Sequence, residues 1–132
     1  MDVERLPEIK EALICYLQGR PEIIFAMLYG SAAEGRAFRD LDIGLFVDRE
    51  LIPVGMELAY AFDLAEELKT IVACPVDVRV INNAPLPFRY NVSRGTPLIV
   101  QDAEIFSHFL ERTWDMFLDF QPLALQYLKE LR

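Results

Sequence analysis

The sequence is poor in the residues that build metal clusters and disulfide frameworks. It contains two cysteines, Cys15 and Cys74, and a single histidine, His108. Neither cysteine has a companion at the spacing of a zinc site, and a disulfide between them is not expected in a reducing compartment. A lone histidine on a predicted helix is typical of a structural or exposed residue. Zinc binding, a disulfide scaffold and histidine catalysis are therefore not expected.

Basic residues and long apolar runs are also scarce. The 13 lysines and arginines are outnumbered by 21 aspartates and glutamates, which gives a formal net charge of −8. Nonspecific nucleic-acid binding requires clustered basic residues, so direct binding to nucleic acid is not expected. The negative charge is explained mainly by its contribution to solubility, and it is also compatible with binding to a basic protein partner. No apolar run reaches membrane-spanning length and residues 1–5 do not resemble a signal peptide, so we expect a cytoplasmic protein.

The chain contains enough hydrophobic residues to form the core of one folded domain. Hydrophobic residues make up 53% of its 132 residues and charged residues 26%, which argues against disorder. No internal repeat, low-complexity segment or linker divides the sequence. We therefore expect a single domain over residues 1–132, with C-terminal helices from about residue 103.

Apolar periodicity predicts helices that alternate with strands along the chain. The expected strands cover residues 23–29, 41–47, 76–81 and 97–100. The expected helices cover residues 3–18, 31–37, 54–71, 86–94, 103–119 and 122–131. In the third of these helices the expected core stripe is Leu58, Phe62, Ala65, Leu68 and Val72. Helices between consecutive strands predict an α/β (α+β) fold, a mixed sheet of about four strands flanked by helices.

The most informative stretch joins the first two predicted strands. The apolar run 23–29 stops at Gly30-Ser31, and the strand 41–47 places Asp40, Asp42 and Gly44 on the face opposite its apolar residues. Glycine lets a backbone approach a ligand closely, and serine can cap a short helix whose N–H groups attract phosphate. Carboxylates on the neighbouring strand can hold Mg²⁺ against the same phosphates. The alternative is an ordinary turn followed by a strand with a solvated face.

A further carboxylate lies on the strand 76–81. Its valines share one face, while Asp77 and Arg79 share the other. An aspartate among β-branched residues requires a reason, and a salt bridge or an edge position would supply an ordinary one.

These features together resemble the minimal nucleotidyltransferase family, within the DNA polymerase β-like superfamily. The family pattern is an apolar strand, Gly-Ser, ten intervening residues and then Asp-x-Asp. Gly30 and Ser31 match it, Asp42 takes the position of the first aspartate, and Gly44 stands where the second is expected. Taking Asp40 and Asp42 as the pair restores two carboxylates, with a connection two residues shorter. The arginine that the family often has shortly after the serine is replaced here by Ala32-Ala33-Glu34.

The resemblance extends over nearly the whole chain. It implies that Asp77 is the family's third metal-binding carboxylate, on a Val-Asp-Val strand. The tail, residues 114–122, is similar to the subgroup that serves as antitoxin to HEPN-domain ribonuclease toxins. The implied fold is nucleotidyltransferase-like, with the nucleotide site at the rim where the second and third strands end near Gly30-Ser31.

The implied activity is transfer of AMP from ATP to a tyrosine of a partner HEPN toxin. Gly30 and Ser31 would hold the outer phosphates, while Asp42 and Asp77, helped by Asp40, would hold two Mg²⁺ ions against the triphosphate. The glycine at position 44 would weaken this metal site. Because Asp42 and residue 44 point the same way, we expect glycine to leave a corner of the site empty, transfer to be slow, and Gly44→Asp to raise the rate by orders of magnitude.

Three functional hypotheses remain open. The first is an adenylyltransferase antitoxin, favoured by the retained Gly30, Ser31, Asp42 and Asp77. The second is a catalytically inactive member that neutralises its partner by binding alone, favoured by Gly44 and by the missing arginine after the serine. The third is a nucleotidyltransferase for a small molecule, which usually requires a further substrate-binding domain. A homo-oligomer is compatible with each of the three.

The C-terminal aromatic residues predict a partner surface. The six are Phe106, Phe109, Trp114, Phe117, Phe120 and Tyr127. Aromatic residues concentrate at protein interfaces. We expect one aromatic face of these helices to be buried in the core and another apolar patch, around Trp114, Phe117 and Phe120, to be exposed.

Overall fold

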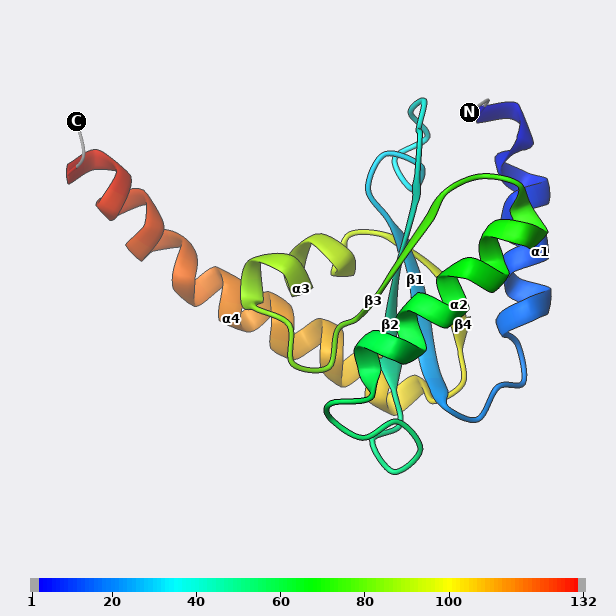
Figure 1. Ribbon diagram of the computed structural model, residues 1–132. Coiled ribbons are helices and arrows are strands. Elements are labelled where there is room, and N and C mark those ends of the chain that lie inside the picture. The colour runs from blue at the N-terminus through cyan, green and yellow to red at the C-terminus, as the bar shows by residue number, and fades with distance from the viewer. Residues whose placement is uncertain (1–2, 131–132) are drawn as a thin grey trace.

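Four strands and four α-helices follow one another in the order α-β-β-α-β-α-β-α in the computed structural model, which describes residues 3–130 and the side chains of residues 4–120 (Figure 1). The strands are β1 (Ile23–Tyr29), β2 (Leu41–Val47), β3 (Val76–Val80) and β4 (Thr96–Val100). The helices are α1 (Leu6–Leu17), preceded by the short 3₁₀ helix η1 (Val3–Arg5), α2 (Glu57–Val72), α3 (Leu86–Ser93) and α4 (Ala103–Glu130).

The strands form one mixed sheet in the order β3-β2-β1-β4. Strand β1 pairs antiparallel with both β2 and β4, whereas β2 pairs parallel with β3 through the α2 crossover. The predicted fold, a mixed four-stranded sheet with flanking helices, is confirmed.

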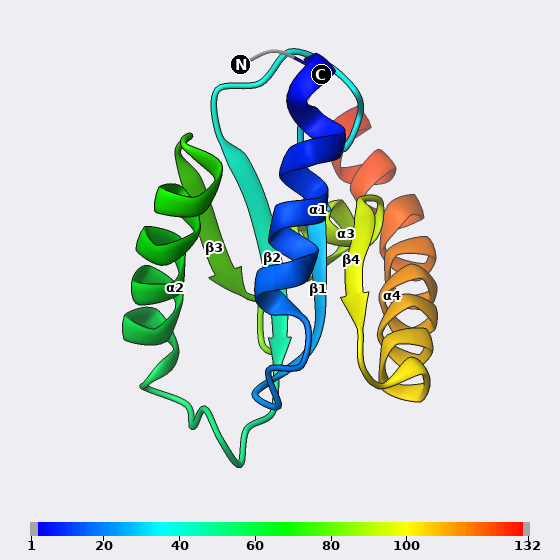
Figure 2. The same ribbon diagram turned by 90° about the vertical axis from the view of Figure 1, so that its right-hand side faces the viewer.

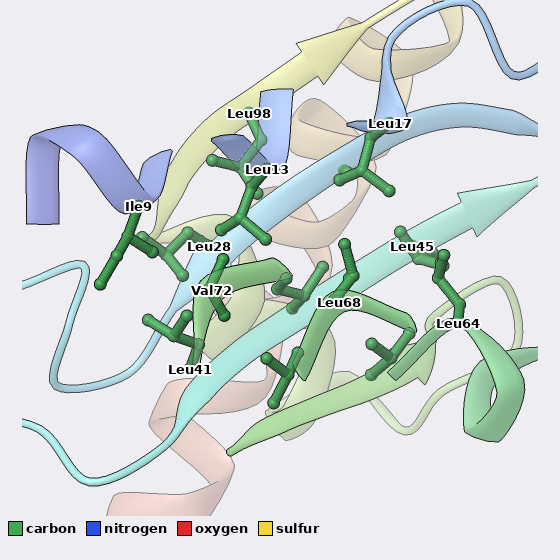
Figure 3. Packing of buried hydrophobic residues seen from close by; sticks show 14 of the residues in the cluster. Ile9, Leu13, Leu17, Leu28, Leu41, Leu45, Leu64, Leu68, Val72 and Leu98 are labelled. Carbon is green, nitrogen blue, oxygen red and sulfur yellow. The ribbon is translucent and has the colours of Figure 1, made fainter. Parts of the chain in front are cut away.

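Helices cover both faces of the sheet (Figures 1 and 2): α1 and α2 lie on one face, and α3 and α4 on the other. Because side chains alternate along each strand, β2 sends Leu41, Ile43 and Leu45 into the core under α1 and α2, where they meet Leu13 and Leu68 (Figure 3). The opposite face holds a smaller core, in which Phe25 packs against Phe109 of α4 with ring centroids 5.2 Å apart.

The connection from β1 to β2 differs from the sequence prediction. The expected helix 31–37 is wrong, because residues 31–35 form consecutive turns instead. Backbone N–H groups of Glu34 and Arg36 donate to the carbonyls of Gly30 and Ser31, and Gly35 has a φ of +73°, a conformation that cannot continue a right-handed helix. The two strands are therefore joined without a crossover helix and run antiparallel.

The core stripe predicted for the helix 54–71 is wrong in its first half. The helix begins at Glu57, and its buried residues are Ala61, Leu64, Leu68 and Val72. Leu58 and Phe62 are 83% and 65% exposed. The helix carries two adjacent apolar stripes, and only contact with β3 and α1 decides which of them faces the sheet.

The C-terminal segment is one helix, not the two predicted at 103–119 and 122–131. Asp102 caps its N-terminus, with Oδ1 accepting from the backbone N–H groups of Glu104 and Ile105 at 3.1 Å. The helix continues through Pro122 to Glu130, since a proline removes one backbone hydrogen bond without necessarily ending a helix. Its C-terminal part runs past α3 and away from the sheet (Figure 1). Within residues 3–130, no helix has both the length and the apolar character needed to cross a membrane.

Candidate functional site

The three central predicted site positions meet at one rim of the sheet. Strand β1 ends at Tyr29, which pairs with Asp42 of β2, and Asp42 in turn pairs with Asp77 of β3. The sequence placed the site where the second and third strands end, but both strands begin at this rim. The antiparallel turn after β1 and the parallel start of β3 therefore bring Gly30, Asp42 and Asp77 together.

Gly30 allows the Asp42 carboxylate to approach the turn. Its φ is +79°, and a Cβ at this position would lie 2.6 Å from Asp42 Oδ2. An L-residue with a side chain would meet both a strained backbone and a steric clash. Ser31 follows in the turn and is partly buried. The fold therefore requires glycine at position 30 of the predicted Gly-Ser turn.

Asp42 and Asp77 face each other on the side of the sheet covered by α3. Burial raises the pKa of Asp42 above its ordinary value, and the negative charges of Asp77 and Asp40 raise it further, while Arg79 lowers it. The Asp77 carboxylate is about half exposed and accepts a hydrogen bond from Arg79 Nε to Oδ2 at 3.2 Å. Because burial and the neighbouring negative charges disfavour the charged form of Asp42, a cation bound beside this carboxylate would stabilise it.

Asp40 is exposed and precedes β2. Among the described residues, no group of three or more histidine, cysteine, aspartate or glutamate side chains could hold a metal ion. Asp40 therefore contributes its charge to the neighbourhood of Asp42 without completing a three-carboxylate cluster.

The corner at Gly44 is not empty, which corrects the expectation from the sequence. Gly44 is buried, and a Cβ there would lie 2.9 Å from Val92 Cγ1 and 3.3 Å from Ile81 Cγ2. Both neighbours are themselves fully buried side chains. The position of the family's second aspartate is thus filled by apolar groups from α3 and from the residue after β3.

This donor set suits one Mg²⁺ ion and not two. Mg²⁺ takes oxygen ligands and is commonly held by one or two carboxylates together with substrate phosphates. Asp42 and Asp77 supply that number. A second ion would need a further carboxylate, but Gly44 provides none and Asp40 lies outside the pair.

Sequence reasoning missed three side chains beside the carboxylates. Tyr29 is 5% exposed, and burial, followed by the charges of Asp42 and Asp77, raises the pKa of its hydroxyl. Its ring packs edge-on against Phe88 of α3 at 5.7 Å, and the Arg79 guanidinium lies over the same Phe88 ring at 5.5 Å. The sequence could have indicated Arg79, because it shares a strand face with Asp77. The position of Phe88 could not be inferred, because it depends on how α3 packs against the sheet.

The hollows of the surface are not centred on the carboxylate pair. One hollow, of about 820 Å³, lies between α2 and the outer edge of β3; its lining includes Phe62, Asp77 and Arg79. A much smaller one, about 20 Å³, lies beside the turn and is lined by Gly30, Glu34, Asn91, Arg94 and Gly95 among others. Asp77 therefore borders the larger hollow and Gly30 the smaller one, with Asp42 between them at the rim of the sheet.

The comparisons with known proteins agree with this geometry. The family model described as polymerase beta, nucleotidyltransferase, matches residues 11–104. A chain in a crystal structure of a toxin–antitoxin with AMP-PNP has a TM-score of 0.72 and 18% identity, covering 92% of this chain and 97% of that chain. A chain of the MntA–HepT toxin–antitoxin has a TM-score of 0.69 and 16% identity, covering 95% and 97% respectively.

A third similar structure is a tri-AMPylated Shewanella oneidensis HEPN toxin in complex with its MNT antitoxin. Its matching chain has a TM-score of 0.71 and 16% identity, covering 96% of this chain and 98% of that chain. At such identities these likenesses establish the fold alone. Among curated protein sequences, none matches this chain significantly.

Proposed function

The chain belongs to the polymerase beta nucleotidyltransferase family, and on that premise we propose that it transfers AMP from ATP to a HEPN-type toxin and so neutralises it. The observation that supports this most directly is the pairing of Asp42 with Asp77 beside the Gly30 turn. The similar solved structures add support for the partner, because they contain HEPN toxins with antitoxins of this fold.

Each site residue has a role in this proposal. The Gly30-Ser31 turn binds the outer phosphates of ATP, and Asp42 and Asp77 hold Mg²⁺ from the adjacent strands. Bound Mg²⁺ supplies charge neutralisation on the α-phosphoryl group and on the departing pyrophosphate. Asp40 adds negative charge at the rim and is not needed as a ligand.

The transfer is a displacement at the α-phosphorus. The hydroxyl oxygen of a toxin tyrosine forms a bond to the α-phosphorus, and the bond from that phosphorus to the oxygen bridging the α- and β-phosphates breaks. Pyrophosphate leaves and the hydroxyl proton passes to solvent. The chain orients ATP for this attack, and the open rim admits a protein side chain as the acceptor.

A second candidate function is neutralisation of the toxin by binding alone. It is favoured by the apolar filling at Gly44 and by the hydrogen bond that already engages Asp77. Under either function we propose a single cytoplasmic domain. A small-molecule acceptor, the third hypothesis, draws no support from the comparison structures.

Labelled ATP separates the two candidates. The protein would be incubated with Mg²⁺, α-labelled ATP and a HEPN-type protein encoded beside it that carries an Arg-x₄₋₆-His motif. We expect label on the toxin, and loss of label with Asp42→Asn or Asp77→Asn. Asp63→Asn, an exposed aspartate on α2, is the matched control. Toxin neutralisation that survives in the Asp42 and Asp77 variants, with no label transferred by the natural protein, would instead establish binding alone.

A further inference from the structure

The strand pairing puts an arginine beside the candidate carboxylates. In the parallel register of β2 and β3, Asp42 lies opposite Asp77 and Gly44 lies opposite Arg79. Because alternate residues of a strand share a face, these four positions form a patch on the side covered by α3. The patch thus combines two carboxylates, one glycine and one guanidinium.

Two contacts fix the direction of the Arg79 side chain. Its Nε donates to Asp77 Oδ2 at 3.2 Å, and its guanidinium lies over the Phe88 ring at 5.5 Å. Phe88 is held in turn by its edge-on contact with Tyr29. The Arg79 side chain is still 60% exposed, so its charge is both oriented and accessible to a ligand arriving from solvent.

Gly44 lies opposite Arg79 and adds no third carboxylate to the patch. A side chain at this position would be forced against Val92 and Ile81, which already fill the space. Arg79 therefore places a positive charge on β3 opposite Gly44 of β2, the position at which the family's second aspartate is missing.

We propose that Arg79 is a built-in phosphate-binding cation of this site, and that it provides part of the charge neutralisation which a second carboxylate-bound metal ion would otherwise provide. The inference rests on the proposed function, because it assigns Arg79 to the nucleotide of that reaction. A guanidinium suits this role since its planar array of N–H donors can bind two phosphate oxygens at once and stays charged at any physiological pH.

This role predicts opposite effects on two ligands. Replacing Arg79 removes a positive charge that attracts phosphates, so nucleotide affinity falls. The same replacement removes a positive charge that repels metal ions and frees the Asp77 carboxylate, so affinity for a divalent ion rises. An arginine that served only to hold β3 in place would not move the two affinities in opposite directions.

The test is a pair of titrations on the purified full chain, carried out with Arg79→Met and Arg79→Lys. AMP-PNP binding is measured by calorimetry in EDTA and again in Mg²⁺, and Mn²⁺ binding is measured by electron paramagnetic resonance without nucleotide. Arg49→Met is the matched control, because Arg49 also pairs with a carboxylate, that of Glu57 at 3.0 Å, beyond the other end of β2. Circular dichroism checks that each variant is folded.

We expect Arg79→Met to weaken AMP-PNP binding in EDTA by about tenfold or more, as for loss of one hydrogen bond to a charged group. We expect it to tighten Mn²⁺ binding, Arg79→Lys to retain part of the nucleotide affinity, and Arg49→Met to change neither. Nucleotide binding that is unchanged or tighter in Arg79→Met overturns the inference and leaves the proposed function standing. Absence of nucleotide binding by the natural protein under both conditions overturns the proposed function, and the inference with it.

Discussion

The Asp42 carboxylate lies against the backbone of Gly30, so closely that a Cβ on Gly30 would be 2.6 Å from Asp42 Oδ2. This contact links the end of β1 to the start of β2 and fixes where the carboxylate points. The Gly30-Ser31 turn and Asp42, which follows it after ten intervening residues, are thus one structural unit, and a substitution in either should affect the other.

Gly30→Ala tests this unit. We expect a loss of about 1–2 kcal/mol in the free energy of unfolding from the left-handed backbone conformation, and a further loss of similar size from the clash with Asp42. Urea denaturation would measure both. Gly19→Ala is the matched control, since Gly19 has nearly the same φ, +81° against +79°, but nothing within 4 Å of its Cβ position.

A double mutant separates the backbone strain from the clash with Asp42. Combining Gly30→Ala with Asp42→Ala should recover the part of the lost unfolding free energy that comes from the clash. Equal destabilisation by Gly30→Ala and Gly19→Ala would show that the Asp42 contact has no energetic weight.

Gly44→Asp should destabilise the protein and not restore a metal site. The new side chain would be forced against Val92 and Ile81, and its carboxylate would be buried among apolar groups. We expect a loss of about 3 kcal/mol or more in the free energy of unfolding, from overpacking and from burial of an unpaired charge. Thermal denaturation would detect it, and Gly44→Asp with Val92→Ala should recover part of the loss. A Gly44→Asp variant of natural stability and raised transfer activity would contradict the structure at this corner.

The exposed apolar surface of α4 should bind the HEPN-type partner. Phe109 is buried, whereas Trp114, Leu118 and Phe120 are 46%, 62% and 46% exposed. The predicted division into a buried and an exposed aromatic face is therefore confirmed for Phe109, Trp114 and Phe120. It is wrong for Phe117, which is partly buried and stacks on the Tyr90 ring of α3 at 3.6 Å; the side chain of Tyr127 lies outside the described ones. We expect Leu118→Asp and Phe120→Asp to weaken complex formation in a pull-down or calorimetric titration without lowering the melting temperature.

Leu58→Asp on α2 is the control for this surface. Leu58 is 83% exposed, so a change there is equally tolerable to the fold, but it lies on a helix that covers the opposite face of the sheet. If Leu58→Asp disrupts the complex and the α4 variants do not, the partner binds over α2 instead.

Local patterns predicted the strands well and the tertiary choices poorly. The alternation in Leu41–Val47 places one face in the core whatever lies above it, so β2 was predicted correctly. In contrast, both apolar stripes of α2 have helical spacing, and packing alone selected Ala61 and Leu64 over Leu58 and Phe62. The filling of the Gly44 corner by Val92 depends on how α3 folds back onto the sheet. That contact spans 48 positions of sequence (92 minus 44), and no periodicity within β2 can indicate it.

Mg²⁺ alone should bind weakly. The Asp42–Asp77 pair offers two carboxylates, and Arg79 is hydrogen-bonded to one of them. Sites with so few protein ligands rely on substrate phosphates to complete the coordination. In calorimetry we expect no tight Mg²⁺ binding to the free protein and clear binding once AMP-PNP is present. Tight binding without nucleotide would indicate a third carboxylate ligand, for which Asp40 is the candidate.

Asparagine substitutions at Asp40 and Asp42 distinguish the two alignments of the acidic motif. If Asp42 is the first aspartate of the pattern, Asp40 is a bystander; if Asp40-Leu41-Asp42 is the motif, both are ligands. The structure favours the first alignment, since Asp40 is exposed and precedes β2, whereas Asp42 is packed against Gly30 and paired with Asp77. We expect Asp40→Asn to leave nucleotide-dependent Mn²⁺ affinity within about fivefold, because an exposed charge contributes at most about 1 kcal/mol. Asp42→Asn should abolish that binding, since it removes one of two ligands. Equal losses in the two variants would establish the shorter connection and make Asp40 a ligand.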